Sequence, residues 1–266
     1  MVLLHVVDLD PRLTALHRLG GFFVLRTAGA AGPSPRSLPT LAQAYGPRRP
    51  DVQGDALDPR RPDVQGDALA SRVRRVAGAL RAPEARVAAS VAHQGLAARL
   101  WSVALGSAAL CGAVPDLAPP LLRWDPEAGA PDDLWLSEVR PLAGDAPTLV
   151  DLVLRAHLEP LAGALRSRHR LAPGLLRGNA ASALAGAARE LDRWGRRHGR
   201  TDVAVRAASL ARDILADPLL AGTGTLTGTV FRRRSCCLYY RVPGGGVCGD
   251  CCFVRPPRSS PRAPSE

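Results

Sequence analysis

The chain has 266 residues, of which 46% are apolar, enough for one large domain or two small ones with a buried core. Its net charge is +11, but all 35 basic residues are Arg, spread along the chain, and there is no Lys. Ile, Asn and Met are also scarce, so a GC-rich coding bias accounts for much of the Arg excess, and the charge argues only weakly for a nucleic-acid partner.

The N-terminal residues predict a small β element that flanks a short helix. Leu3 to Val7 has a strand pattern, and Asp10 followed by Pro11 is typical of a helix start. Gly20 and the Gly after it end this helix, and Phe22 to Arg26 returns to a strand pattern.

Nothing near the N-terminus has the features of a secretory signal. No basic region precedes the first apolar run, and two acidic residues lie within it. The longest apolar stretch, residues 100–114, is too short to cross a bilayer. We therefore expect a cytoplasmic protein without a membrane span, in which clustered cysteines hold a metal or do redox work more often than they form disulfides.

Residues 28–70 are predicted to form a variable surface loop, because they are rich in Pro, Gly, Asp and Arg and lack apolar periodicity. The segment Pro47–Leu57 recurs without change as Pro59–Leu69, a tandem duplication with a 12-residue period. One such pair is too few for a repeat architecture, and surface loops lengthen at little cost.

Helices dominate the rest of the chain. They are expected over residues 71–80, 84–110, 148–168, 179–198 and 201–216, with Thr148 opening the third through a capping box and a strand-like piece at 134–139. The predicted class is α+β and mostly helical, with the N-terminal β element and a Cys-rich, β-hairpin-like segment near the C-terminus. We expect a main domain at 1–228, a metal-binding segment at 229–254 and a disordered tail at 255–266.

Five of the six cysteines lie within seventeen residues, in the spacing C-C-x10-C-x2-C followed by one further Cys. The stretch between the two cysteine groups resembles a hairpin, with β-like Leu238 to Val242 followed by a Pro-Gly-Gly-Gly turn. Such a turn would bring four thiolates to one point. The arginines at 232–234 and Arg241 would favour the thiolate form, which is the one that binds metals.

The spacing alone leaves three interpretations open. A structural zinc ion is one, although adjacent cysteines are an uncommon chelate for a single tetrahedral ion. A [2Fe-2S] cluster is the second, because each of its two irons takes two protein ligands. Glycine amides near the sulfurs, at Gly244 to Gly246 and Gly249, would raise its reduction potential. A redox-active dithiol is the third.

The segment from Arg233 to Cys251 closely resembles the C-terminal signature of FhuF-like ferric siderophore reductases. Residues 88–102 and Gly178–Ser182 are similar to other parts of that family, although Arg177 departs from the aromatic residue expected there. The resemblance implies a [2Fe-2S] cluster whose four ligands are Cys236, Cys237, Cys248 and Cys251. Cys252 and Cys111 lie outside the pattern, and we interpret Cys111 as core packing.

The family resemblance implies a cytoplasmic enzyme that reduces siderophore-bound Fe3+ to Fe2+ by one electron. Its substrate would be a hydroxamate or catecholate complex, whose hard oxygen ligands hold Fe3+ better than Fe2+. Its electrons would come from an external donor such as a ferredoxin or a flavin reductase, because no dinucleotide-binding fingerprint is present. The alternatives are a non-catalytic siderophore-binding or sensing protein with an iron-sulfur cluster, and a zinc-stabilised nucleic-acid-binding module.

Polar residues on two of the predicted helices are candidates for substrate contact. A polar side chain on so apolar a helix as 84–110 must find either a protein partner or a ligand. A buried, hydrogen-bonded histidine, an ion-paired arginine and a helix cap are the ordinary structural alternatives for these residues. The candidate substrate-binding residues are His93, Gln94, Arg99, Trp101 and Asn179.

Overall fold

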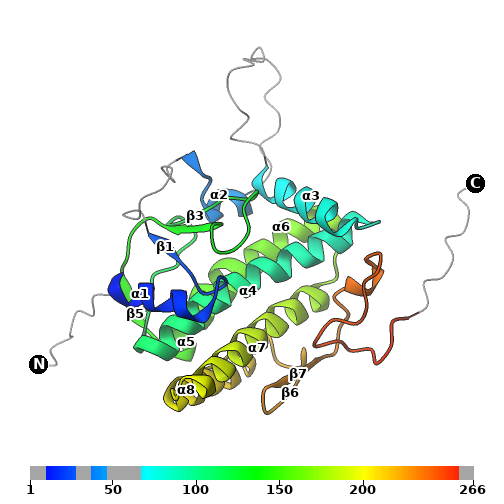
Figure 1. The fold of residues 1–266 in the computed structure, drawn as a ribbon. Coiled ribbons are helices and arrows are strands. Elements are labelled where there is room, and N and C mark those ends of the chain that lie inside the picture. The colour runs from blue at the N-terminus through cyan, green and yellow to red at the C-terminus, as the bar shows by residue number, and fades with distance from the viewer. Residues whose placement is uncertain (1–9, 28–36, 47–66, 258–266) are drawn as a thin grey trace, which may run out of the picture.

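The computed structural model describes residues 10–27, 37–46 and 67–257. Its frame is a set of packed helices in which α4 and α7 lie side by side at the centre (Figure 1). The main helices are α3 (Ala68–Leu80), α4 (Ala85–Cys111), α6 (Glu159–His169), α7 (Pro173–Arg197) and α8 (Thr201–Leu215). Together with the short strands they confirm the mostly helical α+β class.

Helix α4 is buried on nearly all sides, as its run of small and apolar residues predicts. It packs against α7, α3 and α8, and its residues from Trp101 to Ala109 are almost entirely shielded from solvent. Gly112 ends it in the left-handed conformation, with φ 72°. Gly106 admits the N-terminal segment, because a Cβ there would lie 2.8 Å from the Phe23 ring.

Two small sheets cover one side of this frame. Strands β1 (Arg26–Thr27), β4 (Leu134–Leu136) and β3 (Leu122–Trp124) form one sheet, in which β1 runs parallel and β3 antiparallel to β4. Strands β2 (Ala113–Pro115) and β5 (Pro141–Ala143) form the other. The expected strand at 134–139 is therefore present but shorter.

The N-terminal helix is present as α1 (Asp10–Leu16), which continues as the 3-10 turn η1 (His17–Leu19) and ends at Gly20. The strand predicted at Phe22 to Arg26 begins only at Arg26. Within the predicted loop, α2 (Leu41–Tyr45) forms a short helix that was not expected, with a capping box at Thr40. The strand predicted at residues 3–7, most of the tandem duplication and most of the C-terminal tail lie outside the described residues.

The third predicted helix has a different start. Asp145, and not Thr148, is the N-cap, and its carboxylate accepts a 2.9 Å hydrogen bond from the Thr148 amide. The helix then runs through α5 (Ala146–Leu149) and the π-helical stretch η3 (Val150–Leu158) into α6. The fourth predicted helix begins at Pro173, so Asn179 lies inside α7 and does not cap it.

The chain leaves α8 through an antiparallel hairpin, β6 (Gly224–Thr227) and β7 (Val230–Arg233), which packs against α7. The Cys-rich segment (residues 233–253) follows. It contains the 3-10 turn η4 (Tyr239–Arg241) and no strand after Arg233, so the expected β-hairpin between the cysteines is wrong. The hairpin lies directly before them.

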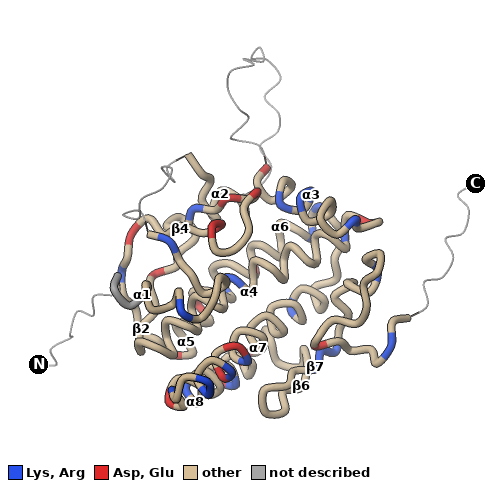
Figure 2. The backbone as a smooth tube through the Cα atoms, viewed as in Figure 1, with Lys and Arg blue, Asp and Glu red and all other residues tan. Residues whose placement is uncertain are grey.

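Basic and acidic residues are intermixed over the surface. Figure 2 shows both signs along α7 and α8, where the arginines form ion pairs such as Arg193–Glu190 and Arg196–Asp192. Within the described residues, no helix combines the length and the apolar character that crossing a membrane requires.

Candidate metal centre

The Cys-rich segment packs against the N-terminal halves of α4 and α7 (Figure 1). At its outer edge Arg241 donates a 2.6 Å hydrogen bond to Glu84, at the start of α4. Ser235 donates one of 3.0 Å to the carbonyl oxygen of Gly174 in α7. The close approach requires glycine at 178, because a Cβ there would lie 2.2 Å from the Ser235 hydroxyl.

Two of the cysteines converge. The Sγ atoms of Cys237 and Cys248 lie 3.4 Å apart, although ten residues separate them in the chain. The reversal between them uses Gly244, with φ 71°, and Gly245, where a Cβ would lie 2.7 Å from the carbonyl oxygen of Tyr239. All six cysteines are free thiols, and Cys237 is the most buried of them.

Backbone amides point at two of the other sulfurs. The Leu238 amide donates to Cys236 Sγ over 3.2 Å, and the Phe253 amide donates to Cys251 Sγ over 3.4 Å. The donor follows its sulfur by two residues in both cases. Hydrogen bonds of this kind stabilise thiolates and raise the potential of a cluster bound to them. These two donors differ from the glycine amides that the sequence suggested.

The close thiol pair has an unequal affinity for protons. The pKa of Cys237 is lowered to about 6, chiefly by its hydrogen bond with Cys248 and to a lesser extent by the backbone amide of Tyr239 and the positive charge of Arg233. The same hydrogen bond and partial burial raise the pKa of Cys248. Their shared hydrogen bond thus favours the thiolate, the form that binds metals, at Cys237.

A buried polar network connects Cys237 to the helices. Ser90 of α4 donates a 2.7 Å hydrogen bond to the carbonyl oxygen of Cys237. The Asn179 amide of α7 donates to the carbonyl oxygen and hydroxyl of Ser90, over 2.9 and 3.1 Å. Asn179 in turn accepts a 2.5 Å hydrogen bond from Arg233, whose side chain is fully buried. This chain of hydrogen bonds fixes Cys236 and Cys237, the first cysteine pair in the chain, between α4 and α7.

Asp250 fixes the second cysteine group, since it lies between Cys248 and Cys251. Its carboxylate accepts hydrogen bonds from Ser182, over 2.6 Å, and from Arg189, over 3.1 Å, both on α7. Its backbone carbonyl accepts from the amide of Arg233, over 3.0 Å. The carboxylate is nearly buried, so these partners satisfy a charge that water does not reach.

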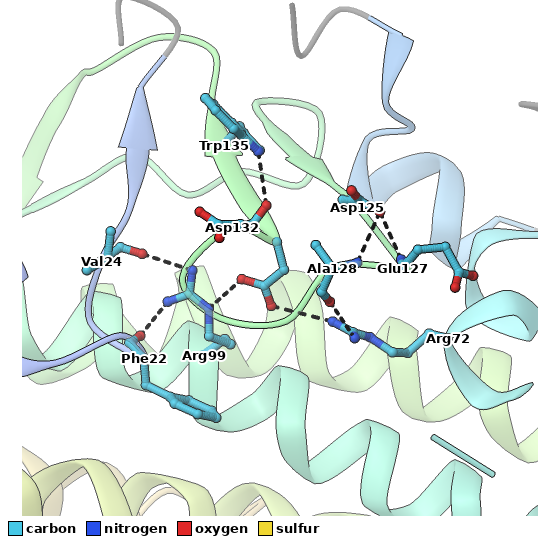
Figure 3. Close-up of polar contacts among 10 residues, drawn as sticks. Phe22, Val24, Arg72, Arg99, Asp125, Glu127, Ala128, Asp132 and Trp135 are labelled. Atoms are coloured by element: carbon cyan, nitrogen blue, oxygen red, sulfur yellow. Dashed lines mark hydrogen bonds and ion pairs between the residues drawn. The ribbon is translucent and has the colours of Figure 1, made fainter. Parts of the chain in front are cut away.

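The predicted substrate residues do not form one group. Arg99 is buried in an ion pair with Asp133, over 2.8 Å, and also donates to the carbonyl oxygens of Phe22 and Val24 (Figure 3). Trp101 is fully buried in the core. Arg99 and Trp101 thus occupy positions typical of residues that stabilise the fold. Asn179 belongs to the hydrogen-bond network that contacts Cys237 through Ser90.

Gln94 and His93 line two different cavities. Gln94 borders an open cavity of about 440 Å3, here called the Cys248 cavity, whose wall also includes Cys248, Gly249 and Asp250. His93 borders a smaller one, of about 140 Å3, between η3, α6 and α7. Burial lowers the pKa of His93 to about 3, and its Nδ1 atom has no hydrogen-bond partner.

The convergence of the thiols is pairwise. Within residues 10–27, 37–46 and 67–257, no three His, Cys, Asp or Glu side chains meet at the spacing of one metal ion, so the expected meeting of four thiolates at one point is not seen. A [2Fe-2S] cluster takes two protein ligands at each iron. The Cys237–Cys248 pair meets that requirement. The backbone amides that donate to the sulfurs of Cys236 and Cys251 also suit thiolates that bind a cluster.

Residues 233–253 match the family described as the FhuF 2Fe-2S C-terminal domain. The matched range is the Cys-rich segment, and its cofactor is therefore a [2Fe-2S] cluster. The match confirms the FhuF-like resemblance of this segment. No curated protein matches the chain significantly.

Three residues of the site could not be distinguished in the sequence, namely Ser90, Arg233 and Asp250. Arg233 was one of a run of arginines, and nothing local distinguishes it from Arg232 or Arg234 before the register of β7 is known. Ser90 is separated from Cys237 by most of the chain. One feature of the sequence could have indicated a role for Asp250, which is an acidic residue between two cysteines.

Proposed function

We propose that this protein is a ferric-siderophore reductase, in which Cys236, Cys237, Cys248 and Cys251 hold the [2Fe-2S] cluster. When bound, the cluster supplies one electron at a time, which suits the conversion of Fe3+ to Fe2+. The observation that carries the proposal is the position of Cys248, which pairs with Cys237 on one side and borders a cavity on the other.

The Cys248 cavity has the size and walls of a small-molecule site. Its volume of about 440 Å3 falls within the usual range for ligand pockets, roughly 300–1,000 Å3. Small residues of α4 and α7 make room for a ligand, and Phe22, which is 46% exposed, offers an apolar surface at the edge. A ferric siderophore in this cavity would lie against a cluster ligand.

The reaction requires no general base or nucleophile in this chain. Hard hydroxamate or catecholate oxygens bind Fe2+ more weakly than Fe3+, so one electron loosens the metal without breaking any bond within the siderophore. The residues of the cavity need only bind and orient the complex close to Cys248. Gln94, in the wall of the Cys248 cavity, is the residue that we assign to substrate contact. An external protein, such as a ferredoxin or a flavin reductase, then supplies the next electron.

The Fe2+ released from a ferric siderophore by pre-reduced protein tests the proposal. Anaerobic protein reduced with dithionite and freed of excess reductant is mixed with a hydroxamate or a catecholate complex, and Fe2+ is trapped with a chelator. We expect Fe2+ to form as the cluster is reoxidised. Binding of the complex without Fe2+ above the control would instead indicate a siderophore-binding or sensing protein.

A cavity-filling variant locates the reaction. Gly186 lines the Cys248 cavity, and a Cβ there would meet nothing closer than the Arg189 guanidinium, at 3.9 Å. Gly186→Leu should therefore fold, keep its cluster and release Fe2+ at least tenfold more slowly. Gly78→Leu, at an open position of α3, is the matched control and should react like the wild type. Equal rates for the two variants would exclude this cavity as the substrate site.

A further inference from the structure

Three successive arginines at the end of β7 and directly after it, Arg232 to Arg234, occupy different environments. The side chains of Arg232 and Arg234 are exposed, whereas Arg233 is 2% exposed, as the alternation of a strand requires. Arg233 extends between α4 and α7, behind the buried Cys237.

All the hydrogen-bond partners of the Arg233 guanidinium are neutral. It donates to the side-chain oxygen of Asn179 over 2.5 Å, and to the Leu175 carbonyl oxygen and the Gln94 side chain over 3.3 Å each. None of the ion pairs formed by the described residues includes Arg233, and its Nε atom has no partner. A buried cation without a counter-charge is costly to maintain.

Three hydrogen bonds connect the Arg233 guanidinium to a proposed cluster ligand, from Arg233 to Asn179, from Asn179 to Ser90, and from Ser90 to the carbonyl oxygen of Cys237. The backbone amide of Arg233 also donates a 3.0 Å hydrogen bond to the carbonyl oxygen of Asp250, which lies between Cys248 and Cys251. A [2Fe-2S] cluster with four thiolate ligands carries a net negative charge that grows by one on reduction. A fixed positive charge in a buried, weakly screened position stabilises the reduced form more than the oxidised form.

We propose that Arg233 is the buried counter-ion of the cluster, which positions the first cysteine pair against α4 and α7 and raises the reduction potential. The inference rests on the ligand set proposed above but not on the siderophore. Arg233 is a positioning residue, because it acts on the cluster through charge and through the Asn179–Ser90–Cys237 contacts. Its contact with Gln94 also links this charge to the wall of the Cys248 cavity.

The reduction potential of the holoprotein, followed by visible and EPR spectroscopy in the absence of siderophore, tests this role. At a fixed solution potential, Arg233→Gln should decrease the ratio of reduced to oxidised cluster at least tenfold, which is 59 mV for a one-electron couple. Arg232→Gln and Arg234→Gln remove the same charge from the exposed positions on either side of Arg233 and should change the ratio less than threefold. Arg233→Lys keeps the charge and should restore most of the potential.

If Arg233→Gln does not retain its cluster, a second variant tests whether the charge of Arg233 raises the reduction potential. Gln94→Glu keeps the side-chain shape and places a carboxylate on the guanidinium, so it should also decrease the reduced fraction at least tenfold. A shift for Arg233→Gln no larger than that of Arg232→Gln would overturn the proposal, as would an unchanged potential in Gln94→Glu. Because no siderophore is present, these results are independent of whether the protein releases Fe2+.

Discussion

Ser182, in the middle of α7, donates a 2.6 Å hydrogen bond to Asp250, which lies between two cysteines of the FhuF-type segment. Arg189, about two turns further along α7, donates a 3.1 Å hydrogen bond to the other carboxylate oxygen of Asp250. The second cysteine group is thus held by α7, in addition to the hydrogen bond that Asp250 accepts from the Arg233 amide at the end of β7.

Loss of the Asp250 carboxylate should weaken cluster retention. In Asp250→Ala, Ser182 and Arg189 lose their partner, at a cost of about 1.5–3 kcal/mol for a hydrogen bond to a charged group. The half-life of the cluster absorbance in the presence of an iron chelator should fall severalfold. Asp192→Asn, which removes an outer ion pair of the same helix, is the control and should leave the half-life unchanged. Equal half-lives in the two variants would show that Asp250 does not anchor the segment.

Arg99 and Asp133 should contribute to stability and not to electron transfer. The pair is buried, with side chains 2% and 3% exposed, so Asp133→Asn leaves an uncompensated charge and should cost about 3–5 kcal/mol. Urea unfolding measures the loss, and the cluster spectrum and potential should not change. Glu138→Gln, which breaks the exposed pair with Arg140, should unfold like the wild type. A changed cluster potential in Asp133→Asn would contradict this purely structural role.

In addition to His93, buried His157 should contribute to a decline in stability on acidification. Burial lowers its pKa to about 4, with its ring between the Tyr45 hydroxyl and the Leu117 carbonyl oxygen. The unfolded state, with a pKa near 6.5, then binds the proton first, so the contribution is complete above pH 6.5 and is lost as the pH falls toward 4. Between pH 8 and pH 5 the loss is about 2 kcal/mol.

Urea unfolding followed by tryptophan fluorescence at both pH values measures this loss. In His157→Gln, which cannot be protonated, the decline between pH 8 and pH 5 should be smaller by about 2 kcal/mol, and buried His93, whose pKa is also lowered, accounts for part of the decline that remains. The same decline in His157→Gln as in the wild type would assign the effect to other groups.

Much of the helical frame could be predicted from the sequence. Helix α4 is recognisable because small and apolar residues continue for its whole length. The start of the third helix was misassigned because Asp145 and Thr148 both begin plausible caps, and local pattern does not rank them. Strand β6 has no strand pattern in the sequence, because the glycines at 222, 224 and 228 are typical of a break in regular structure. Gly224 is tolerated there because the Phe231 ring occupies the space of its Cβ, which would lie 2.3 Å away.

The site was predictable only as far as its chemistry is local. The spacing of the cysteines indicates a metal centre by itself, since the residues are close in the chain. The contacts of Ser90 with Cys237 and of Ser182 with Asp250 join distant segments, and they depend on how α4 and α7 pack. The separation of Gln94 and His93 into different cavities has the same origin, because adjacent positions on a helix point in different directions.

The iron and acid-labile sulfide content of six single Cys→Ala variants, purified anaerobically, tests the central claim most directly. We predict that the variants of Cys236, Cys237, Cys248 and Cys251 lose both elements and the visible spectrum, whereas Cys111→Ala and Cys252→Ala keep the wild-type ratio of each per chain. Wild-type iron and sulfide in Cys237→Ala or Cys248→Ala would contradict the account, as would their loss in Cys252→Ala.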